Sequence, residues 1–146
     1  MQRRTFLLAS IAVLALPLPA FAAPIRATLY KNPQCSCCEG YADYLRQNGF
    51  QVEVKPTNDL TEISRKAGVP EALQGCHSTF IDRYVIDGHV PVEMVNKLLA
   101  EKPDIAGITL PGMPIGSPGM FGAKTETFTI YALTRDGKPP TVYATQ

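Results

Sequence analysis

Three of the four cysteines in the chain lie within four residues, in the segment Cys35-Ser36-Cys37-Cys38. Cys35 and Cys38 form a Cys-x-x-Cys pair that follows a predicted strand and opens a predicted helix. Backbone amides and the helix dipole at such an N-terminus stabilise a thiolate, so they lower the pKa of the thiol. A thiolate of this kind attacks disulfides well and is also a ligand for a soft metal.

The third cysteine of this segment separates the two chemistries. A dithiol switch needs only two sulfurs, and Cys37 between them would compete by forming the wrong disulfide. Three thiolates on one helical turn instead suit Cu(I) or zinc. The fourth cysteine, Cys76, stands beside His77 just before another predicted strand. This pair adds a thiol and an imidazole, and we expect His77 to be a ligand or a group that supports one.

Three further residues can bear on a metal site. His89 follows a predicted hairpin turn, a position that is typical of a solvated turn residue but also allows a metal role. Met113 and Met120 lie seven residues apart in a segment rich in glycine and proline. Their thioethers suit Cu(I), and they equally suit the packing of this segment onto a core.

The remaining sequence predicts the elements that must position these residues. Alternating and β-branched residues predict strands, and apolar residues at helical spacing between caps and glycine stops predict helices. Asp59 resembles the first residue of a capping box. Asp87-Gly88 is read as a hairpin turn, after which His89-Val90 would begin the return strand. The predicted ranges are strands 25–30, 50–54 and 79–86 and helices 37–48, 59–67 and 92–100.

The resulting order, β-α-β-α-β-β-α, is that of the thioredoxin fold. In that fold the loop before the third strand approaches the redox pair and usually carries a cis-proline. Here the loop reads Gly75–Thr79 and has no proline. We therefore expect Cys76 to face Cys35, so that all four cysteines meet.

A loop and a hairpin are predicted to extend this core. Residues 108–122 hold prolines and glycines that predict a loop with defined turns. Residues 125–133 and 141–144 alternate on either side of a turn at Asp136-Gly137. The predicted fold class is thus α/β, a thioredoxin-like core over residues 24–104 with a C-terminal loop and β-hairpin extension over residues 105–146, packed on the same domain.

Residues 1–23 have the three parts of an export signal: two arginines, an apolar run and the cleavage pattern Ala20-Phe21-Ala22. Arg3-Arg4 also resembles the twin-arginine signal. The signal holds two of the 14 basic residues and none of the 13 acidic ones, so the mature chain carries 12 basic and 13 acidic residues. This balance excludes attraction to nucleic acid or anionic lipid, and we expect no stable membrane span.

Composition and spacing leave several interpretations of the cysteines open. Two structural disulfides would satisfy four cysteines in an exported protein. A metal-free oxidoreductase would use Cys35 as the attacking thiolate and Cys38 as the resolving thiol. A [2Fe–2S] site fits the ligand type but not the known spacings.

Taken together, four motifs resemble the CopG-type periplasmic copper-resistance proteins over residues 27–143. These motifs are Cys-x-Cys-Cys after "YKNPQ", Cys-His before the third strand, "IDGHVP" and "GMPIGSPGM". The resemblance implies a thioredoxin-like fold whose C-terminal extension helps to bind copper, and a multinuclear copper–sulfur site. It implies sulfur ligands at Cys35, Cys37, Cys38 and Cys76, then at Met113 and Met120, with His77 and His89 as further candidates.

The segment "YKNPQCSCCE" also resembles arsenate-reductase and Spx-type proteins, which are cytoplasmic and use single or paired cysteines. The export signal and the extra cysteines count against that role. We therefore expect a periplasmic copper-binding monomer of copper homeostasis that holds more than one ion and interconverts Cu(I) and Cu(II). Its partners would be other periplasmic copper-handling proteins. The enzyme class open to it is a copper oxidoreductase, and the same ligands would serve a copper chaperone or store.

Overall fold

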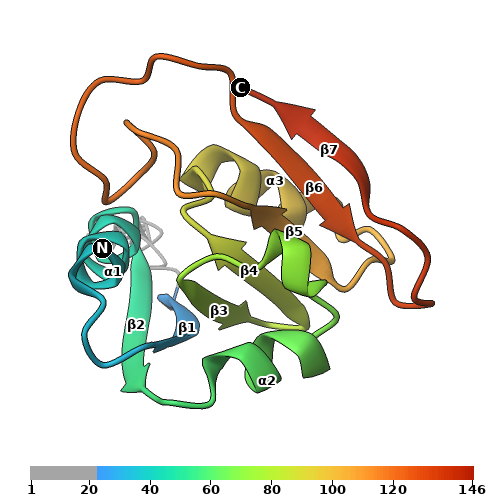
Figure 1. The fold of residues 1–146 in the computed structure, drawn as a ribbon, viewed down its shortest axis with the longest axis horizontal. Coiled ribbons are helices and arrows are strands. Elements are labelled where there is room, and N and C mark those ends of the chain that lie inside the picture. Colours follow the sequence, from blue (N-terminus) through green and yellow to red (C-terminus); the bar gives the residue numbers. More distant parts are fainter. Residues whose placement is uncertain (1–22) are drawn as a thin grey trace, which may run out of the picture.

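The computed structural model describes residues 23–146. The predicted export signal therefore lies outside the described residues, apart from Ala23. Within the described range the chain forms a mixed α/β fold with one seven-stranded sheet, in the order β2-β1-β3-β4-β5-β6-β7 (Figure 1). No helix in this range is long and apolar enough to cross a membrane.

The first half of the sheet is built from two parallel strands and a hairpin. β1 and β2 pair in parallel through the intervening helix α1, and β1 pairs antiparallel with β3 on its other side. β3 and β4 form an antiparallel hairpin. The elements are β1 (Ile25–Lys31), α1 (Ser36–Gln47), β2 (Phe50–Pro56), α2 (Leu60–Lys66), the 3-10 helix η1 (Glu71–Leu73), β3 (His77–Ile81) and β4 (Tyr84–Gly88).

The second half continues the same sheet. β5 pairs in parallel with β4 after a crossover through α3, and β6 and β7 follow as an antiparallel hairpin, as predicted. The elements are α3 (Val92–Glu101), β5 (Gly107–Leu110), β6 (Thr129–Leu133) and β7 (Thr141–Thr145). β5 corrects the prediction that residues 108–122 are all loop, and β6 is shorter than the predicted strand 125–133.

The prediction of a single strand over residues 79–86 with a turn at Asp87-Gly88 was wrong. The hairpin turns at Asp82-Arg83, where Asp82 adopts a φ of 53°, a conformation that aspartate tolerates better than most residues. Asp87 instead lies within β4, opposite Ser78 of β3. Gly88 pairs with Leu110 of β5, and its missing side chain permits that close approach. His89 therefore follows β4 and does not begin a return strand.

The start of α2 also differs from the prediction. Asp59 stands at the N-cap position, but its side chain makes no capping hydrogen bond within the described residues. Its backbone N–H donates to Thr57 Oγ1 at 3.0 Å. The predicted capping box is therefore absent from this part of the structure.

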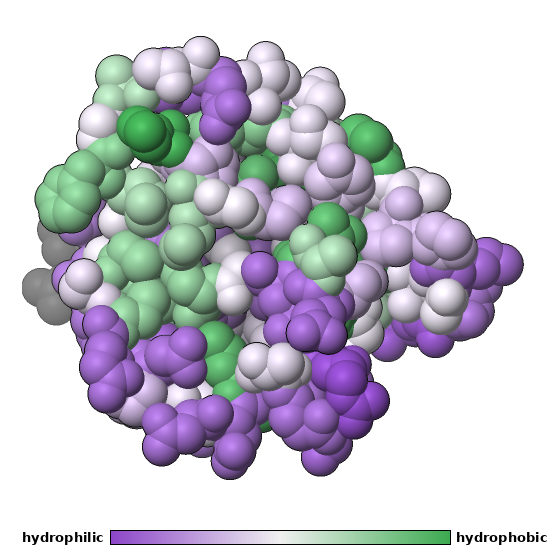
Figure 2. Space-filling model, viewed as in Figure 1, coloured by the Kyte–Doolittle hydropathy of each residue, from purple (hydrophilic) through white to green (hydrophobic). Residues whose placement is uncertain are grey.

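Apolar residues pack on both faces of the sheet. Alternate residues of a strand point to opposite faces, so Tyr84 and Ile86 join one cluster and Val85 joins another. The larger cluster holds the inner faces of α1 and α3, including Cys38 and Leu98. Figure 2 shows apolar side chains gathered on the side where α1 lies in Figure 1, whereas the lower edge near α2 is polar. The first turn of α1 is thus anchored in the main core.

Candidate metal centre

The four cysteines lie in one cluster, as the sequence predicts. Cys35 is the N-cap residue of α1, Cys37 and Cys38 lie in its first turn, and Cys76 immediately precedes β3. The Sγ atoms of Cys37 and Cys76 are 3.7 Å apart, and those of Cys38 and Cys76 are 3.5 Å apart. One ligand atom from each of the four residues lies within 4.8 Å of all the others. The pairing of β1 with both β2 and β3 brings the start of α1 beside Cys76.

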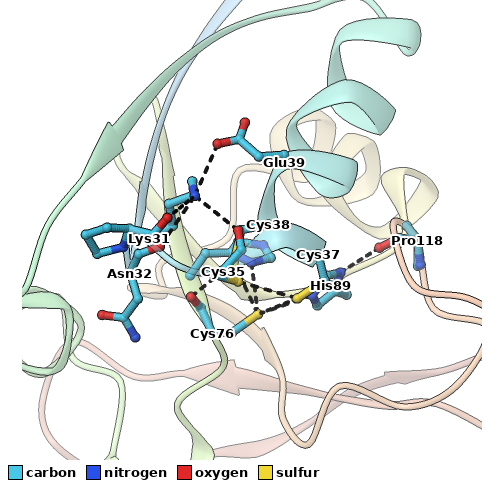
Figure 3. The surroundings of a disulfide bond; sticks show 11 residues. Lys31, Asn32, Cys35, Cys37, Cys38, Glu39, Cys76, His89 and Pro118 are labelled. Atoms are coloured by element: carbon cyan, nitrogen blue, oxygen red, sulfur yellow. Dashed lines mark hydrogen bonds and ion pairs between the residues drawn. A yellow bond between two sulfur atoms is a disulfide. The ribbon is translucent and has the colours of Figure 1, made fainter.

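Two of these cysteines are joined in this structure. Cys35 and Cys38 form a disulfide, whereas Cys37 and Cys76 are free thiols (Figure 3). Cys38 is fully buried, and the other three cysteines are half-buried. Two structural disulfides, one of the interpretations that the sequence left open, are therefore not what this structure holds.

A buried lysine supports the loop that leads into α1. Lys31 is only 3 % exposed, and its Nζ donates to the carbonyl oxygen of Cys35 at 3.0 Å. It also approaches the carbonyls of Asn32 and Pro33 at 3.4 Å and forms an ion pair with Glu39 at 3.1 Å (Figure 3). This role of Lys31 was not predicted, although the residue stands in the segment directly before the cysteine motif. The ammonium group holds together the chain on both sides of Cys35.

His89 is fully buried and faces Cys76. Its Nδ1 lies 2.6 Å from the carbonyl oxygen of Pro118, which can only accept, so Nδ1 carries the proton. Its Nε2 lies 3.2 Å from Cys76 Sγ. Burial lowers the pKa of His89, which favours the neutral ring with a free lone pair on Nε2. A histidine whose other nitrogen is fixed by a carbonyl is a common arrangement in metal sites.

His77 completes the nitrogen side of the cluster. Its Nδ1 lies 3.5 Å from Cys76 Sγ, and its buried Nε2 has no hydrogen-bond partner among the described residues. Burial and the neighbouring His89 lower the pKa of His77. The ring of Tyr41 packs against both imidazoles, at 4.6 Å from His77 and 5.4 Å from His89 between ring centroids. These contacts of Tyr41 with the histidines were not predicted from the sequence.

The segment of residues 111–122, here called the site loop, lies against α1. A side chain on Gly119 would meet the backbone of Gly40 and Tyr41, so the two segments approach as closely as glycine allows. This contact places Pro118 next to His89. Met120 follows immediately and is half-buried, whereas Met113 is 41 % exposed. The structure brings the two histidines together with Cys76, and the ligand roles of the histidines and methionines stay predictions.

A buried carboxylate holds the backbone before Cys76. Asp87 accepts hydrogen bonds from Gly75 N and from Ser78 Oγ, both at 2.5 Å, and Thr109 Oγ1 lies 3.5 Å away. Burial raises the pKa of Asp87 to about 6, although these donors oppose the shift. Asp87 was predicted as a turn residue, so this role was also missed.

The cluster has the chemistry of a soft-metal site. Thiolate sulfur and neutral imidazole nitrogen are ligands for copper and zinc. Burial raises the pKa of Cys76 to about 12, with a further contribution from Cys37, so the metal-free thiol is protonated. A metal ion that binds this sulfur displaces the proton. The nitrogen of His77 that faces this sulfur is Nδ1, at 3.5 Å from Cys76 Sγ.

The fold and the cluster define a class: α/β proteins in which a helix N-terminus and a neighbouring strand form a cysteine–histidine centre. Two solved structures described as "Copper resistance protein copG", Form 1 and Form 2, match this chain. Each match has a TM-score of 0.77 and 34 % sequence identity and covers 84 % of this chain and 98 % of the other. The chain belongs to the CopG family of copper resistance proteins.

A family described as "Protein of unknown function, DUF411" also matches, over residues 73–120. That range begins in η1 and ends in the site loop, so it includes Cys76 and both histidines but not the Cys-x-Cys-Cys motif. No curated protein matches the chain.

Proposed function

We propose that this chain is a periplasmic copper-binding protein of copper homeostasis and resistance. The observation that carries the proposal is that the four cysteine sulfurs lie together and that one of them, Cys76, also lies together with the imidazoles of His77 and His89. Membership of the copper resistance family selects copper among the metals that such donors bind. Copper is here the cargo or substrate of the protein. The proposed ligands are Cys35, Cys37, Cys38, Cys76, His77 and His89, with Met113 and Met120 from the site loop.

The donor set supports more than one copper ion. Six cysteine and histidine donors exceed the four that a tetrahedral ion takes. The free sulfurs of Cys37 and Cys76 lie 3.7 Å apart, so that neighbouring ions can share thiolate bridges. In the proposed centre the thiolates hold Cu(I), and the half-buried cysteines leave access for copper or electrons to pass to another copper-handling protein.

The proposed architecture is a thioredoxin-like core over residues 24–104 with a C-terminal extension over residues 105–146. Its support is the Cys-x-x-Cys pair at the N-terminus of α1, between the parallel strands β1 and β2, with β3 and β4 as the following hairpin. The extension adds β5, β6 and β7 to the sheet and carries the site loop. We propose a monomer exported by the signal at residues 1–23, through the twin-arginine route.

Copper binding is tested with the fully reduced protein under anaerobic conditions. Cu(I) affinity and stoichiometry are measured by competition with a chromogenic Cu(I) chelator. We expect Cys37→Ser and Cys76→Ser each to lower affinity and the number of ions bound. Ser36→Ala, at an exposed position in the same turn, serves as the matched control and should bind as the wild type does. Unchanged stoichiometry and affinity in both cysteine variants would refute the proposal.

A metal-free thiol–disulfide oxidoreductase is the second candidate, and the Cys35–Cys38 disulfide favours it. This function predicts that the metal-free protein catalyses reduction of insulin disulfides. It also predicts that Cys38→Ser abolishes this activity and that Cys37→Ser retains it. A protein that binds copper at the cluster and lacks insulin reductase activity fits only the first function.

A further inference from the structure

The four sulfurs of the cluster are in two chemical states. Cys35 and Cys38 are bonded to each other, and Cys37 and Cys76 are thiols. Cys37 Sγ lies 3.4 Å from Cys35 Sγ, and Cys76 Sγ lies 3.5 Å from Cys38 Sγ (Figure 3). Each free thiol therefore contacts a different half of the disulfide. Since the two free thiols are themselves 3.7 Å apart, the sulfurs form a closed ring.

These two states offer different ligands within the same backbone. With the Cys35–Cys38 pair reduced, the cluster can present four thiolates, which are the form of cysteine that binds metal. With the pair oxidised, only Cys37 and Cys76 can ionise, beside the imidazole of His89 at 3.2 Å from Cys76 Sγ. Loss of two electrons from the pair thus halves the number of thiolates and leaves a smaller thiol–imidazole site.

We propose that the Cys35–Cys38 pair supplies the electrons with which this centre reduces Cu(II). The inference rests on the proposed copper-binding function and goes beyond it by naming the electron donor. The thiolates of Cys35 and Cys38 each lose one electron and form the S–S bond. Two Cu(II) ions each gain one of these electrons and become two Cu(I) ions. Where the sulfurs begin as thiols, two protons pass to solvent.

The remaining donors receive the product of this step. The sulfurs of Cys37 and Cys76 and the Nε2 of His89 stay available after the disulfide forms. The two sulfurs are the soft ligands that Cu(I) prefers, and imidazole also binds copper. Their contact with the disulfide sulfurs means that copper need not leave the cluster when its oxidation state changes. The same geometry therefore couples reduction to retention of the reduced ion.

The different burial of Cys35 and Cys38 determines which sulfur is attacked when the disulfide is reduced again. Cys38 is fully buried, whereas Cys35 is half-buried at the N-cap of α1. An external dithiol can therefore attack Cys35 Sγ, forming a mixed disulfide and releasing Cys38 as a thiolate. The amides of the first turn of α1 stabilise that thiolate. The second sulfur of the external dithiol then displaces Cys35 and leaves as part of an external disulfide, so that both protein thiols are restored.

The step is tested by adding Cu(II) to the fully reduced protein without oxygen. Cu(I) is counted with a Cu(I)-specific chelator, and the lost thiols are located by alkylation and peptide mass mapping. We expect two Cu(I) ions for each pair of thiols lost, with a disulfide that joins Cys35 to Cys38. Cu(I) formation with four intact thiols, or a disulfide between Cys37 and Cys76, would overturn the inference.

Two variants with three thiols each separate this pair from general thiol reactivity. Cys38→Ser removes the bonding partner of Cys35 and leaves only the contact with Cys37 Sγ at 3.4 Å, so we expect initial Cu(I) formation to slow at least about tenfold. Cys37→Ser weakens retention of copper but still forms the Cys35–Cys38 disulfide. Reduction of Cu(II) by Cys38→Ser at the wild-type rate would overturn the inference. Even where a variant fails to fold, the peptide map of the wild-type protein shows which cysteines form the disulfide and so tests the inference.

Direct addition of Cu(I) keeps this inference distinct from the proposed function. A wild-type protein that binds Cu(I) at its four cysteines but does not reduce Cu(II) upholds copper binding and refutes the Cys35–Cys38 pair as donor. A protein that forms the Cys35–Cys38 disulfide with Cu(II), but whose reduced form binds no added Cu(I), refutes the proposed binding function and upholds the electron source.

Discussion

The Nδ1–H of His89 donates a 2.6 Å hydrogen bond to the carbonyl oxygen of Pro118, 29 positions later in the chain. This bond fixes the ring so that Nε2 points at Cys76 Sγ. The acceptor belongs to the site loop, which is held on α1 by the close approach of Gly119 to Gly40 and Tyr41. The glycine contact, the carbonyl and the imidazole form one chain of positioning contacts that ends at Cys76, in the proposed metal centre.

Substitution of Gly119 is expected to weaken copper binding without touching a ligand. In Gly119→Ala the new Cβ would lie 2.5 Å from Tyr41 N and 2.8 Å from Gly40 C, so the loop must move away from α1. Loss of the Pro118 acceptor frees the ring of His89. Loss of a group that orients a ligand typically costs ~10–100-fold in metal affinity. The measurement is Cu(I) affinity by chelator competition.

Gly112→Ala is the matched control for this prediction. Gly112 has a φ of 82°, against 80° for Gly119, so both variants carry the same backbone strain. A Cβ on Gly112 meets no atom within 4 Å. Equal losses of affinity in the two variants would attribute the effect to backbone strain and contradict the positioning role of the contact.

Removal of the buried lysine is expected to destabilise the loop before α1. Lys31→Met keeps an apolar stem but leaves the carbonyl of Cys35 without its 3.0 Å donor. An unsatisfied buried group costs ~1–3 kcal/mol, and we expect the free energy of unfolding to fall by that amount. Chemical denaturation of the metal-free protein measures it.

Lys55→Met serves as the comparison, because the side chain of Lys55 is 43 % exposed and pairs with the exposed Glu53 at 3.5 Å. A surface pair of this kind contributes ~0–1 kcal/mol. If the two lysine variants unfold alike, Lys31 does not hold the loop as its contacts indicate.

The meeting of the cysteines could be predicted because spacing and element order determine it. Cys35 and Cys38 open a helix, and Cys76 precedes a strand that pairs beside β1. The place of His89 could not be predicted in the same way. Asp87-Gly88 matches a hairpin turn locally, but Asp87 is a buried hydrogen-bond acceptor and Gly88 packs against β5. Tertiary contacts decide between these uses of the same dipeptide.

The polar support of the site was missed for the same physical reason. Asp87 and Tyr41 act on the cluster through a backbone group and rings that are distant in the sequence. Lys31 instead contacts carbonyls one to four residues away, and a buried lysine in this role is not distinguishable from a surface lysine by residue type. Thr109 and Ser78 join Asp87 across three strands. A single sequence gives no local signal for such contacts, whereas cysteine and histidine can be identified as candidate ligands from residue type alone.

The stability of the metal-free protein is expected to fall as pH rises from about 4 to about 6. Burial raises the pKa of Asp87 from its ordinary value of 3.8 to about 6, so in this range the folded state keeps a proton that the unfolded state has released. The contribution of this group is greatest below pH 3.8 and is lost as pH rises through about 6. A shift of about two units corresponds to ~3 kcal/mol.

Denaturation of wild type and Asp87→Asn across this pH range tests the prediction. The asparagine does not titrate, so the difference between the two proteins should vary with pH, whatever the asparagine costs at fixed pH. Asp59→Asn, at an exposed position, is the control and should follow the pH dependence of the wild type. Parallel curves for wild type and Asp87→Asn would show that this carboxyl group is not the source of the pH dependence of stability.

Cu(I) affinity is expected to rise with pH, in part through Cys76. Burial and the neighbouring Cys37 raise the pKa of Cys76 to about 12, so its thiol is protonated at neutral pH. Each such proton that copper displaces raises affinity about tenfold per pH unit below the pKa. The lowered pKa of His89 leaves its ring neutral above pH 6.5, so it releases no proton there.

Between pH 7 and 8, Cys76→Ser should therefore reduce the slope of log affinity against pH by about one. Affinity is measured at each pH by chelator competition, with the chelator's own titration subtracted. A slope equal to that of the wild type would mean that Cys76 is already ionised before copper arrives, or that it does not bind the ion.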